Sequence, residues 1–261
     1  MKEVLNVSTS GGRSSMFMAR LIQTGESFQR EYEPLYLFCN TGKERSETLD
    51  FLKEAQERWS IPIVWLEAVV HSDKGAATTH RVVSYESASR RGEPFDAVIE
   101  KYGVPNRSYR HCTRELKQHV MASYLKSLGY KSWTSAIGFR FDEPHRMSGQ
   151  TKWGPAIYPL YDLCMRRQAI RLWWNEQPFD LGIEDYQGNC DLCFAKNLSK
   201  KVKIAQENPE LLKWWQDKEK QSDRPFDIRE CVSMEELEQM AKGSLEMPSH
   251  EQQEFSCMCE L

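Results

Sequence analysis

The stretch VLNVSTSGGRSSMFMARLI at residues 4–22 decides how the fold is read. Residues 4–8 are apolar enough for a short buried strand, and residues 16–22 have the composition of a helix. The Ser- and Gly-rich turn between them offers backbone N–H groups and hydroxyls at the start of that helix, which suits a phosphate or sulfate group. An ordinary solvated turn is the alternative, because Gly and Ser are common in such turns.

The alternation of strand and helix continues along the chain. Further strands are predicted at residues 35–39, 61–70, 133–138 and 156–160. Helices are predicted from Ser46, at residues 167–176, 197–206 and 209–220, and after the capping box at residues 233–236. This order indicates an α/β fold: an open, mostly parallel, twisted sheet with helices on both faces.

The chain divides into three predicted parts. Residues 1–180 form a nucleotide-binding α/β domain, in which the polar segment 71–111 is expected as an insertion over the sheet edge. Residues 181–241 form a helical, cysteine-bearing C-terminal region, and residues 242–261 form a polar, mobile tail.

Composition excludes several classes of protein. The 261 residues carry 35 Lys+Arg against 38 Asp+Glu, and 40% are hydrophobic, which are ordinary values for a globular protein. No apolar run approaches the roughly 20 residues of a membrane span, and the N-terminus lacks the apolar core of a signal peptide. We therefore expect a cytoplasmic protein without membrane contact. Residues 80–131 are locally basic, which suits a nucleotide or tRNA phosphate or is only a solvated face.

Cysteine spacing points to soft metal ligands. Cys190 and Cys193 form a C-x-x-C, Cys257 and Cys259 form a C-x-C, and Cys112 lies in the basic segment. A C-x-x-C with a distant third thiolate suits an iron–sulfur cluster or zinc, and a metal-free dithiol is the alternative. The other cysteines are expected as small buried residues: Cys39, Cys164 and Cys231.

Five segments, in order, resemble the motifs of one superfamily. They are SGGRSS at residues 10–15, FCNTGKE at 38–44 with Glu47, Thr48 and Phe51, CTRELK at 112–117, IGFRFDEPHR at 137–146 and GNCDLC at 188–193. Together they resemble the PP-loop superfamily of N-type ATP pyrophosphatases and PAPS (3′-phosphoadenylyl sulfate) reductases, above all the PAPS-reductase-like proteins of phages and prophages. The resemblance covers about residues 4–200 and implies an adenine nucleotide alpha-hydrolase-like fold.

The resemblance also implies a binding site for an adenine nucleotide: PAPS, APS (adenylyl sulfate) or ATP. The turn that holds its phosphate or sulfate group would consist of Ser8, Ser10, Gly11, Gly12, Arg13, Ser14 and Ser15. Thr41 and Gly42 would lie near the ribose or base, and the loop with Gly138, Arg140 and Arg146 would clamp the charged end. Surface ion pairs with Asp142 or Glu143 are the alternative role of these arginines.

The implied metal group is a [4Fe–4S] cluster on Cys112, Cys190 and Cys193, with zinc as the alternative. APS reductases carry a Cys-Cys pair where this chain has His111-Cys112, so the fourth ligand is open. Cys164, His111 or a tail cysteine would complete the site, or one iron would stay open to substrate.

The implied reaction is that of a sulfonucleotide reductase, in which a tail thiol attacks the sulfur of the bound nucleotide. Cys259 and Cys257 are the candidate nucleophiles by role, because the family's Glu-Cys-Gly-Leu-His segment is absent here. A thiol reductant such as thioredoxin or glutaredoxin would then regenerate the thiols. A spare metal ligand or an inert tail is the alternative for this pair.

Two other functions stay open. An ATP pyrophosphatase would adenylate a substrate for tRNA or DNA thiolation, although Ser14 stands where that class has Asp. A non-catalytic nucleotide- or nucleic-acid-binding module would use a structural zinc and the aromatic Trp133, Trp153, Trp173 and Trp174. Spacing favours a core position for four tryptophans, Trp173, Trp174, Trp214 and Trp215. A homo-oligomer is compatible with each function.

Overall fold

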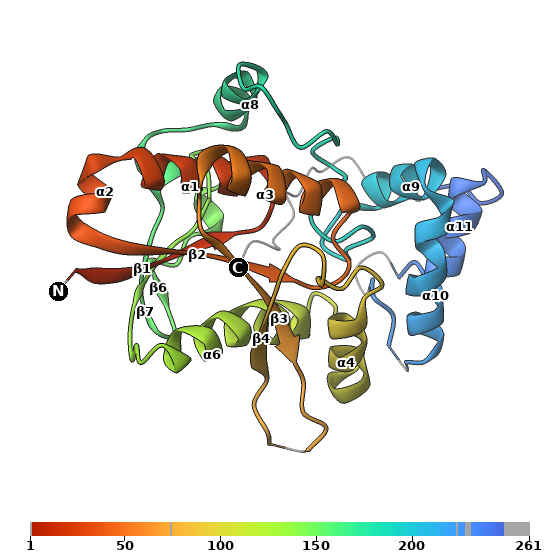
Figure 1. Cartoon of the computed structure of the whole chain (residues 1–261). Helices are drawn as coiled ribbons and strands as arrows, with labels where there is room; N and C mark the ends of the chain where they lie inside the picture. The colour runs from red at the N-terminus through yellow and green to blue at the C-terminus, as the bar shows by residue number, and fades with distance from the viewer. Residues whose placement is uncertain (1, 74, 223, 228–230, 248–261) are drawn as a thin grey trace.

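A computed structural model describes residues 2–73, 75–222, 224–227 and 231–247 (Figure 1). Within these residues seven strands form one sheet in the order β4-β3-β2-β1-β5-β7-β6. The strands are β1 (Glu3–Thr9), β2 (Tyr32–Asn40), β3 (Ile63–Val69), β4 (Thr79–Val83), β5 (Thr134–Ala136), β6 (Gln150–Thr151) and β7 (Gly154–Ile157). Pairs among the inner strands are parallel, and only β4 and β6, the outermost described strands, run antiparallel to their neighbours. The predicted mostly parallel sheet is confirmed.

Helices cover both faces of the sheet, as predicted (Figure 1). One face carries α1 (Arg13–Thr24), α2 (Glu26–Glu31), α3 (Ser46–Trp59), α7 (Pro159–Asp162) and α8 (Arg167–Asn175). The other carries α4 (Glu93–Tyr102), α5 (His111–Thr113), the π-helical turn η1 (Arg114–Gln118) and α6 (His119–Ser127). The C-terminal helices α9 (Leu198–Glu207), α10 (Leu212–Lys220) and α11 (Met234–Ala241) stand beside α4. Two 3₁₀ turns complete the elements, η2 (Pro144–Arg146) and η3 (Pro209–Leu211).

Apolar residues at helical spacing explain which face of α3 packs against the sheet. In α3, Leu49, Leu52 and Ala55 recur every three residues, and all three are buried against the sheet. Burying one such leucine contributes about 1.5–3 kcal/mol. The C-terminal helices share one continuous core with α4 and α6, so α9, α10 and α11 pack directly onto the α/β part.

Some predicted boundaries differ from the structure. The segment 71–111, which the sequence predicts as an insertion over the sheet edge, contains the edge strand β4 and helix α4. Helix α3 begins at Ser46, as predicted, with Arg45 as its N-cap. The strand predicted at 156–160 ends at Ile157, because Pro159 begins α7. The capping box of Ser233 at the start of α11 is confirmed.

The topology brings two loops together at the carboxyl edge of the sheet. The chain runs outward from β1 through β2 and β3 to β4, and then returns to place β5 on the other side of β1. Such a switch point opens a crevice where open α/β sheets bind ligands. None of the described helices combines the length and apolar character that crossing a bilayer requires.

Candidate functional site: an arginine-lined cavity at the switch point

The turn after β1 leads directly into the N-terminus of α1. Gly11 has φ +75°, and a Cβ there would lie 2.4 Å from Thr48 Cγ2, so the position requires glycine. Ser15 Oγ accepts from Ser10 N at 3.1 Å and donates to the Gly12 carbonyl at 2.9 Å, which closes the turn. No side chain caps α1, and its first turn has no acidic residue. The helix N-terminus is therefore prepared for an anion.

The loop after β5 packs directly on this turn. A Cβ at Gly138 would lie 3.2 Å from Ser15 Cα, so the two backbones touch only because residue 138 is glycine. Two residues on, Arg140 Nη1 donates to Ser14 Oγ at 3.3 Å. The predicted phosphate turn and the predicted arginine loop, more than 120 residues apart in sequence, therefore lie together.

Glu143 holds both predicted clamp arginines. Its Oε1 lies 3.1 Å from Arg140 Nη2 and 2.7 Å from Arg146 Nη1. Arg140 also pairs with Asp142 at 3.2 Å. Burial opposes ionisation of Asp142, but the hydrogen bond and charge of Arg140 outweigh it and lower the pKa of Asp142. Ion pairs of these arginines with Asp142 and Glu143 are therefore present, but the two pairs with Glu143 are buried and are not the surface pairs considered as the alternative.

Arg146 nevertheless keeps unused donor capacity. Its side chain is only 4% exposed, and its Nη2 has no hydrogen-bond partner within the described part of the chain. The guanidinium lies over the Phe139 ring, 4.2 Å from its centroid. An unsatisfied buried donor costs about 1–3 kcal/mol, more for a charged group, so this nitrogen favours an incoming acceptor.

A cavity of about 300 Å³ lies where these elements meet. Gly12, Ser14, Arg140 and Arg146 are among the residues that line it. Its described lining contains seven basic side chains against three carboxylates: Arg13, Arg140, Arg146, Arg167, Arg171, Lys196 and Lys200 against Glu143, Glu184 and Asp185. We call it the arginine cavity. Its size is at the lower end of small-molecule sites, and its charge suits an anion.

Arg13 lines the arginine cavity, and its described hydrogen bonds go to one wall of it. Its Nε donates to Asp180 Oδ1 at 2.7 Å, and its Nη1 donates to Asp185 Oδ1 and to the Ile183 carbonyl, each at 3.0 Å. These contacts tie the segment 180–185 to the start of α1. Arg13 therefore builds a wall of the arginine cavity.

A second, narrow cavity shares the lining residue Asn189 with the arginine cavity. Ser8, Ser10, Ser15 and Gly138 also line it. Its volume of about 20 Å³ admits one water-sized group. Cys39, Glu44, Lys117 and Met121 form part of its inner wall. We call it the inner cavity.

Thr41 and Gly42 do not line either cavity in the described residues. Thr41 Oγ1 donates to Glu44 Oε1 at 2.8 Å, and a Cβ at Gly42 would lie 3.0 Å from Gly92 N. Both residues therefore shape the loop after β2, and their predicted place beside a ribose or base stays a prediction.

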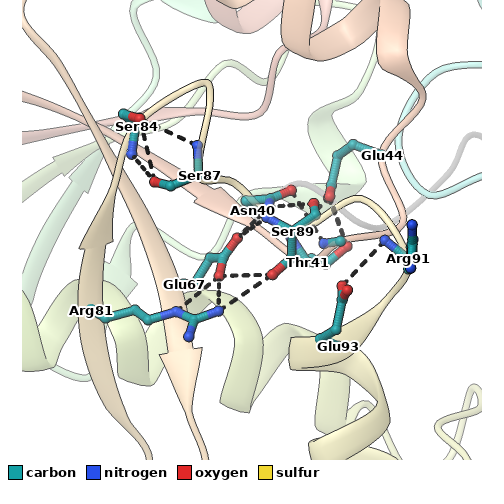
Figure 2. A network of polar contacts seen from close by, with 11 residues as sticks. Asn40, Thr41, Glu44, Glu67, Arg81, Ser84, Ser87, Ser89, Arg91 and Glu93 are labelled. Atoms are coloured by element: carbon teal, nitrogen blue, oxygen red, sulfur yellow. Dashed lines mark hydrogen bonds and ion pairs between the residues drawn. The ribbon is translucent and has the colours of Figure 1, made fainter.

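A buried glutamate that sequence reasoning missed fixes this loop (Figure 2). Glu67 on β3 is fully buried and accepts from Asn40 Nδ2 at 2.6 Å, Ser89 N at 2.6 Å and Arg81 Nε at 3.0 Å. Asn40 Oδ1 in turn accepts from Gly42 N at 3.2 Å. The sequence feature that could have revealed Glu67 is its position as a single carboxylate in the apolar run IVWLEAV, because a buried carboxylate needs partners.

Two of the predicted metal ligands lie near the inner cavity. Cys190 Sγ is 3.6 Å from Thr41 Oγ1, and Cys190 and Cys112 lie close enough to influence each other's ionisation. Burial raises the pKa of Cys190 to about 12, and burial also raises the pKa of Cys112. Cys193 is buried beside them in the same core.

The described thiols alone do not form a metal centre. Among the described residues no group of three or more His, Cys, Asp or Glu side chains is arranged to hold a metal ion. The candidate nucleophiles Cys257 and Cys259 lie outside the described residues. A cluster or zinc ion on Cys112, Cys190 and Cys193 therefore stays a prediction.

The predicted burial of the other cysteines and of the tryptophans is confirmed for some of them and not for others. Cys39 is buried as expected, but Cys164 and Cys231 are exposed, so the prediction of small buried residues is wrong for these two. Both have a positive φ, 55° at Cys164 and 52° at Cys231. Trp174 and Trp215 are each 1% exposed, which confirms them as core residues, whereas Trp173 and Trp214 are half-buried.

Comparison with known proteins places the chain among phage proteins. It is 31% identical over 199 residues to the uncharacterized nin region protein ORF290 of Escherichia phage lambda, covering 74% of this chain and 67% of that protein. The chain belongs to the family of ORF290. The predicted kinship with phage proteins is thereby confirmed.

More distant relatives of this ORF290-family member are archaeal. Two uncharacterized proteins of Methanocaldococcus jannaschii are 23% and 25% identical over 83% and 82% of the chain. The chain spans less than half of their length, 42% and 47%. No protein-family model matches the chain. A crystal structure of phosphoadenylyl-sulfate (PAPS) reductase from Candida auris, a phosphate complex, aligns with 14% identity and a TM-score of 0.42, covering 66% of this chain and 71% of that one.

Proposed function

We propose that this chain is a sulfonucleotide reductase-like enzyme that binds an adenine nucleotide, PAPS or APS, with its charged end in the arginine cavity. One observation carries the proposal: residues 12–14 of the turn after β1 and the loop with Arg140 and Arg146 line one cavity, where Arg146 Nη2 has no partner in the described residues. The sequence motifs that select an adenine nucleotide are those given above.

The chemistry of the lining supports a phosphate or sulfate ligand. The uncapped N-terminus of α1 supplies oriented N–H groups, and guanidinium groups match tetrahedral oxyanions with paired donors. Glu143 holds Arg140 and Arg146 in place before the ligand arrives, which reduces the ordering cost of binding.

In the proposed reaction a thiolate of Cys259 or Cys257 attacks the sulfur of the bound nucleotide. A sulfur–sulfur bond forms to give S-sulfocysteine, the sulfur–oxygen bond breaks, and AMP or 3′,5′-ADP leaves with the electron pair. The second thiol then attacks the S-sulfocysteine sulfur, releases sulfite and forms a disulfide, which an external dithiol reductant such as thioredoxin or glutaredoxin reduces. Cations in the arginine cavity stabilise the charge on the leaving phosphate.

No step is assigned to a metal group, because the described thiols alone do not form its site. The [4Fe–4S] cluster predicted on Cys112, Cys190 and Cys193 has its own test. Iron and acid-labile sulfide are quantified after anaerobic purification, with zinc measured in parallel. A colourless protein with neither metal removes this part of the proposal.

The experiment for the reaction incubates the protein separately with APS, PAPS and ATP under a dithiol reductant. Sulfite release that Cys257→Ser or Cys259→Ser abolishes supports the proposal, and Cys231→Ser is the matched control because it replaces an exposed cysteine outside the candidate pair. Pyrophosphate release from ATP that survives both tail substitutions overturns it in favour of an ATP pyrophosphatase, and stimulation by tRNA or DNA then identifies the acceptor. Absence of any product overturns both.

A further inference from the structure

A third cavity lies away from the arginine cavity, between α6, β5 and the β6–β7 hairpin. Its volume is about 220 Å³, and its lining includes Asn6, Met121, Trp133, Ser135 and Trp153. None of its described lining residues belongs to the arginine cavity. Met121 is its only described wall in common with the inner cavity. We call it the tryptophan cavity.

Two aromatic rings shape this cavity. Trp133 and Trp153 stack with centroids 5.8 Å apart and planes within 18° of parallel. Trp133 N donates to the Trp153 carbonyl at 3.2 Å, so backbone pairing fixes the second ring relative to the first. Flat aromatic surfaces of this kind accept planar heterocycles by stacking.

A buried amide gives the cavity polar specificity. Asn6 is 4% exposed, and its Oδ1 has no hydrogen-bond partner in the described part of the chain. Its Nδ2 makes only a long contact of 3.8 Å to Met121 Sδ. An amide oxygen that has left water without a partner costs about 1–3 kcal/mol, so the site favours a ligand that brings an N–H donor.

The remaining lining excludes a strongly charged occupant. Apart from Lys152, the described lining residues are uncharged, and they include the amides of Gln118 and Gln150 and the hydroxyls of Ser148 and Thr151. This lining contrasts with the seven cations of the arginine cavity. The ligand is therefore planar, neutral and able to donate from a ring nitrogen or an amino group.

We propose that the tryptophan cavity binds a nucleobase, with its face on the half-buried ring of Trp153, which the buried Trp133 supports, and an N–H directed at Asn6 Oδ1. A volume of about 220 Å³ is below that of usual drug-sized pockets and suits a single base. The base arrives either as a free nucleoside or as one unstacked base of a nucleic-acid strand. The site is separate from the arginine cavity and does not depend on the reaction proposed there.

The test measures binding by calorimetry of adenosine, guanosine, cytidine and uridine, of a mixed-sequence single-stranded oligonucleotide, and of ribose 5-phosphate as a probe without a base. We expect a nucleoside or the oligonucleotide to bind, and Trp153→Ala to weaken that binding at least about fivefold, the lower end of the loss of one base stack. Asn6→Leu should weaken it as well. Arg140→Met serves as the control, because it changes the arginine cavity and leaves this binding intact.

Each outcome decides the proposal. Binding of nucleosides that depends on Trp153 supports a small-molecule source, and binding of the oligonucleotide alone that depends on Trp153 supports a strand. Trp153→Ala decides by itself if Asn6→Leu unfolds, because Trp153 is only half-buried. Binding that is unchanged in Trp153→Ala, or lost only in Arg140→Met, or no base binding at all, overturns it.

Discussion

Replacement of Arg146 by methionine separates ligand binding from structural support. The substitution keeps an apolar side chain of similar length over Phe139 and removes the guanidinium, including the Nη2 that has no partner in the described residues. A hydrogen bond to a charged group contributes about 1.5–3 kcal/mol, so the affinity for a phosphosulfate nucleotide should fall about 10- to 100-fold. Binding of adenosine, which lacks the charged end, should not change.

Arg13→Met provides the matched comparison within the same cavity. Arg13 already gives its donors to Asp180, Asp185 and the Ile183 carbonyl, so its removal should cost folding stability and weaken the nucleotide less than Arg146→Met does. Calorimetric titration with APS or PAPS gives the two affinities, and thermal unfolding gives the two stabilities. Equal losses of affinity in both variants, or wild-type affinity in Arg146→Met, would refute the reasoning.

Three further predictions concern packing and charge. Gly138→Ala places a Cβ 3.2 Å from Ser15 Cα, so nucleotide affinity should fall with a Tm loss of a few degrees; an unchanged Kd would contradict the close contact. Burial opposes ionisation of Glu115, but its hydrogen bonds and cationic partners prevail and lower its pKa. Glu115→Gln should therefore lower the free energy of unfolding at pH 7, and the difference from wild type should shrink as pH falls below the unfolded pKa near 4.5. A difference in unfolding free energy that persists in acid would argue against an ionic origin. Lys201 and Asp227 form a buried ion pair. Lys201→Met removes the lysine from this pair and should lower the free energy of unfolding, measured with denaturant, by about 3–5 kcal/mol. The double variant with Asp227→Leu should recover part of this loss.

Local sequence was enough to predict the Ser- and Gly-rich turn after β1 and the helix that follows it. Gly11 lies in this Gly-rich turn, where its positive φ favours glycine. The buried face of α3 followed from apolar spacing. These features depend on residues that are neighbours in the chain.

Features that depend on distant partners could not be predicted. Arg13 is bound by Asp180 and Asp185, which lie 167 and 172 positions away, so its motif alone assigned it to the ligand. Strand β4 was missed because one of its sides is exposed, which leaves few apolar residues to reveal it. Glu67 was missed because its partners come from β2, β4 and the loop at Ser89.

The two edge strands of the described sheet restrict how copies of this protein can associate. The outer strands β4 and β6 offer only five and two residues of backbone, and Arg81 of β4 already reaches back to Glu67. A second molecule thus finds little free backbone for continuing the sheet across an intermolecular boundary. Any symmetric dimer should therefore form through helix surfaces, which leaves the crevice at the carboxyl edge open in each copy.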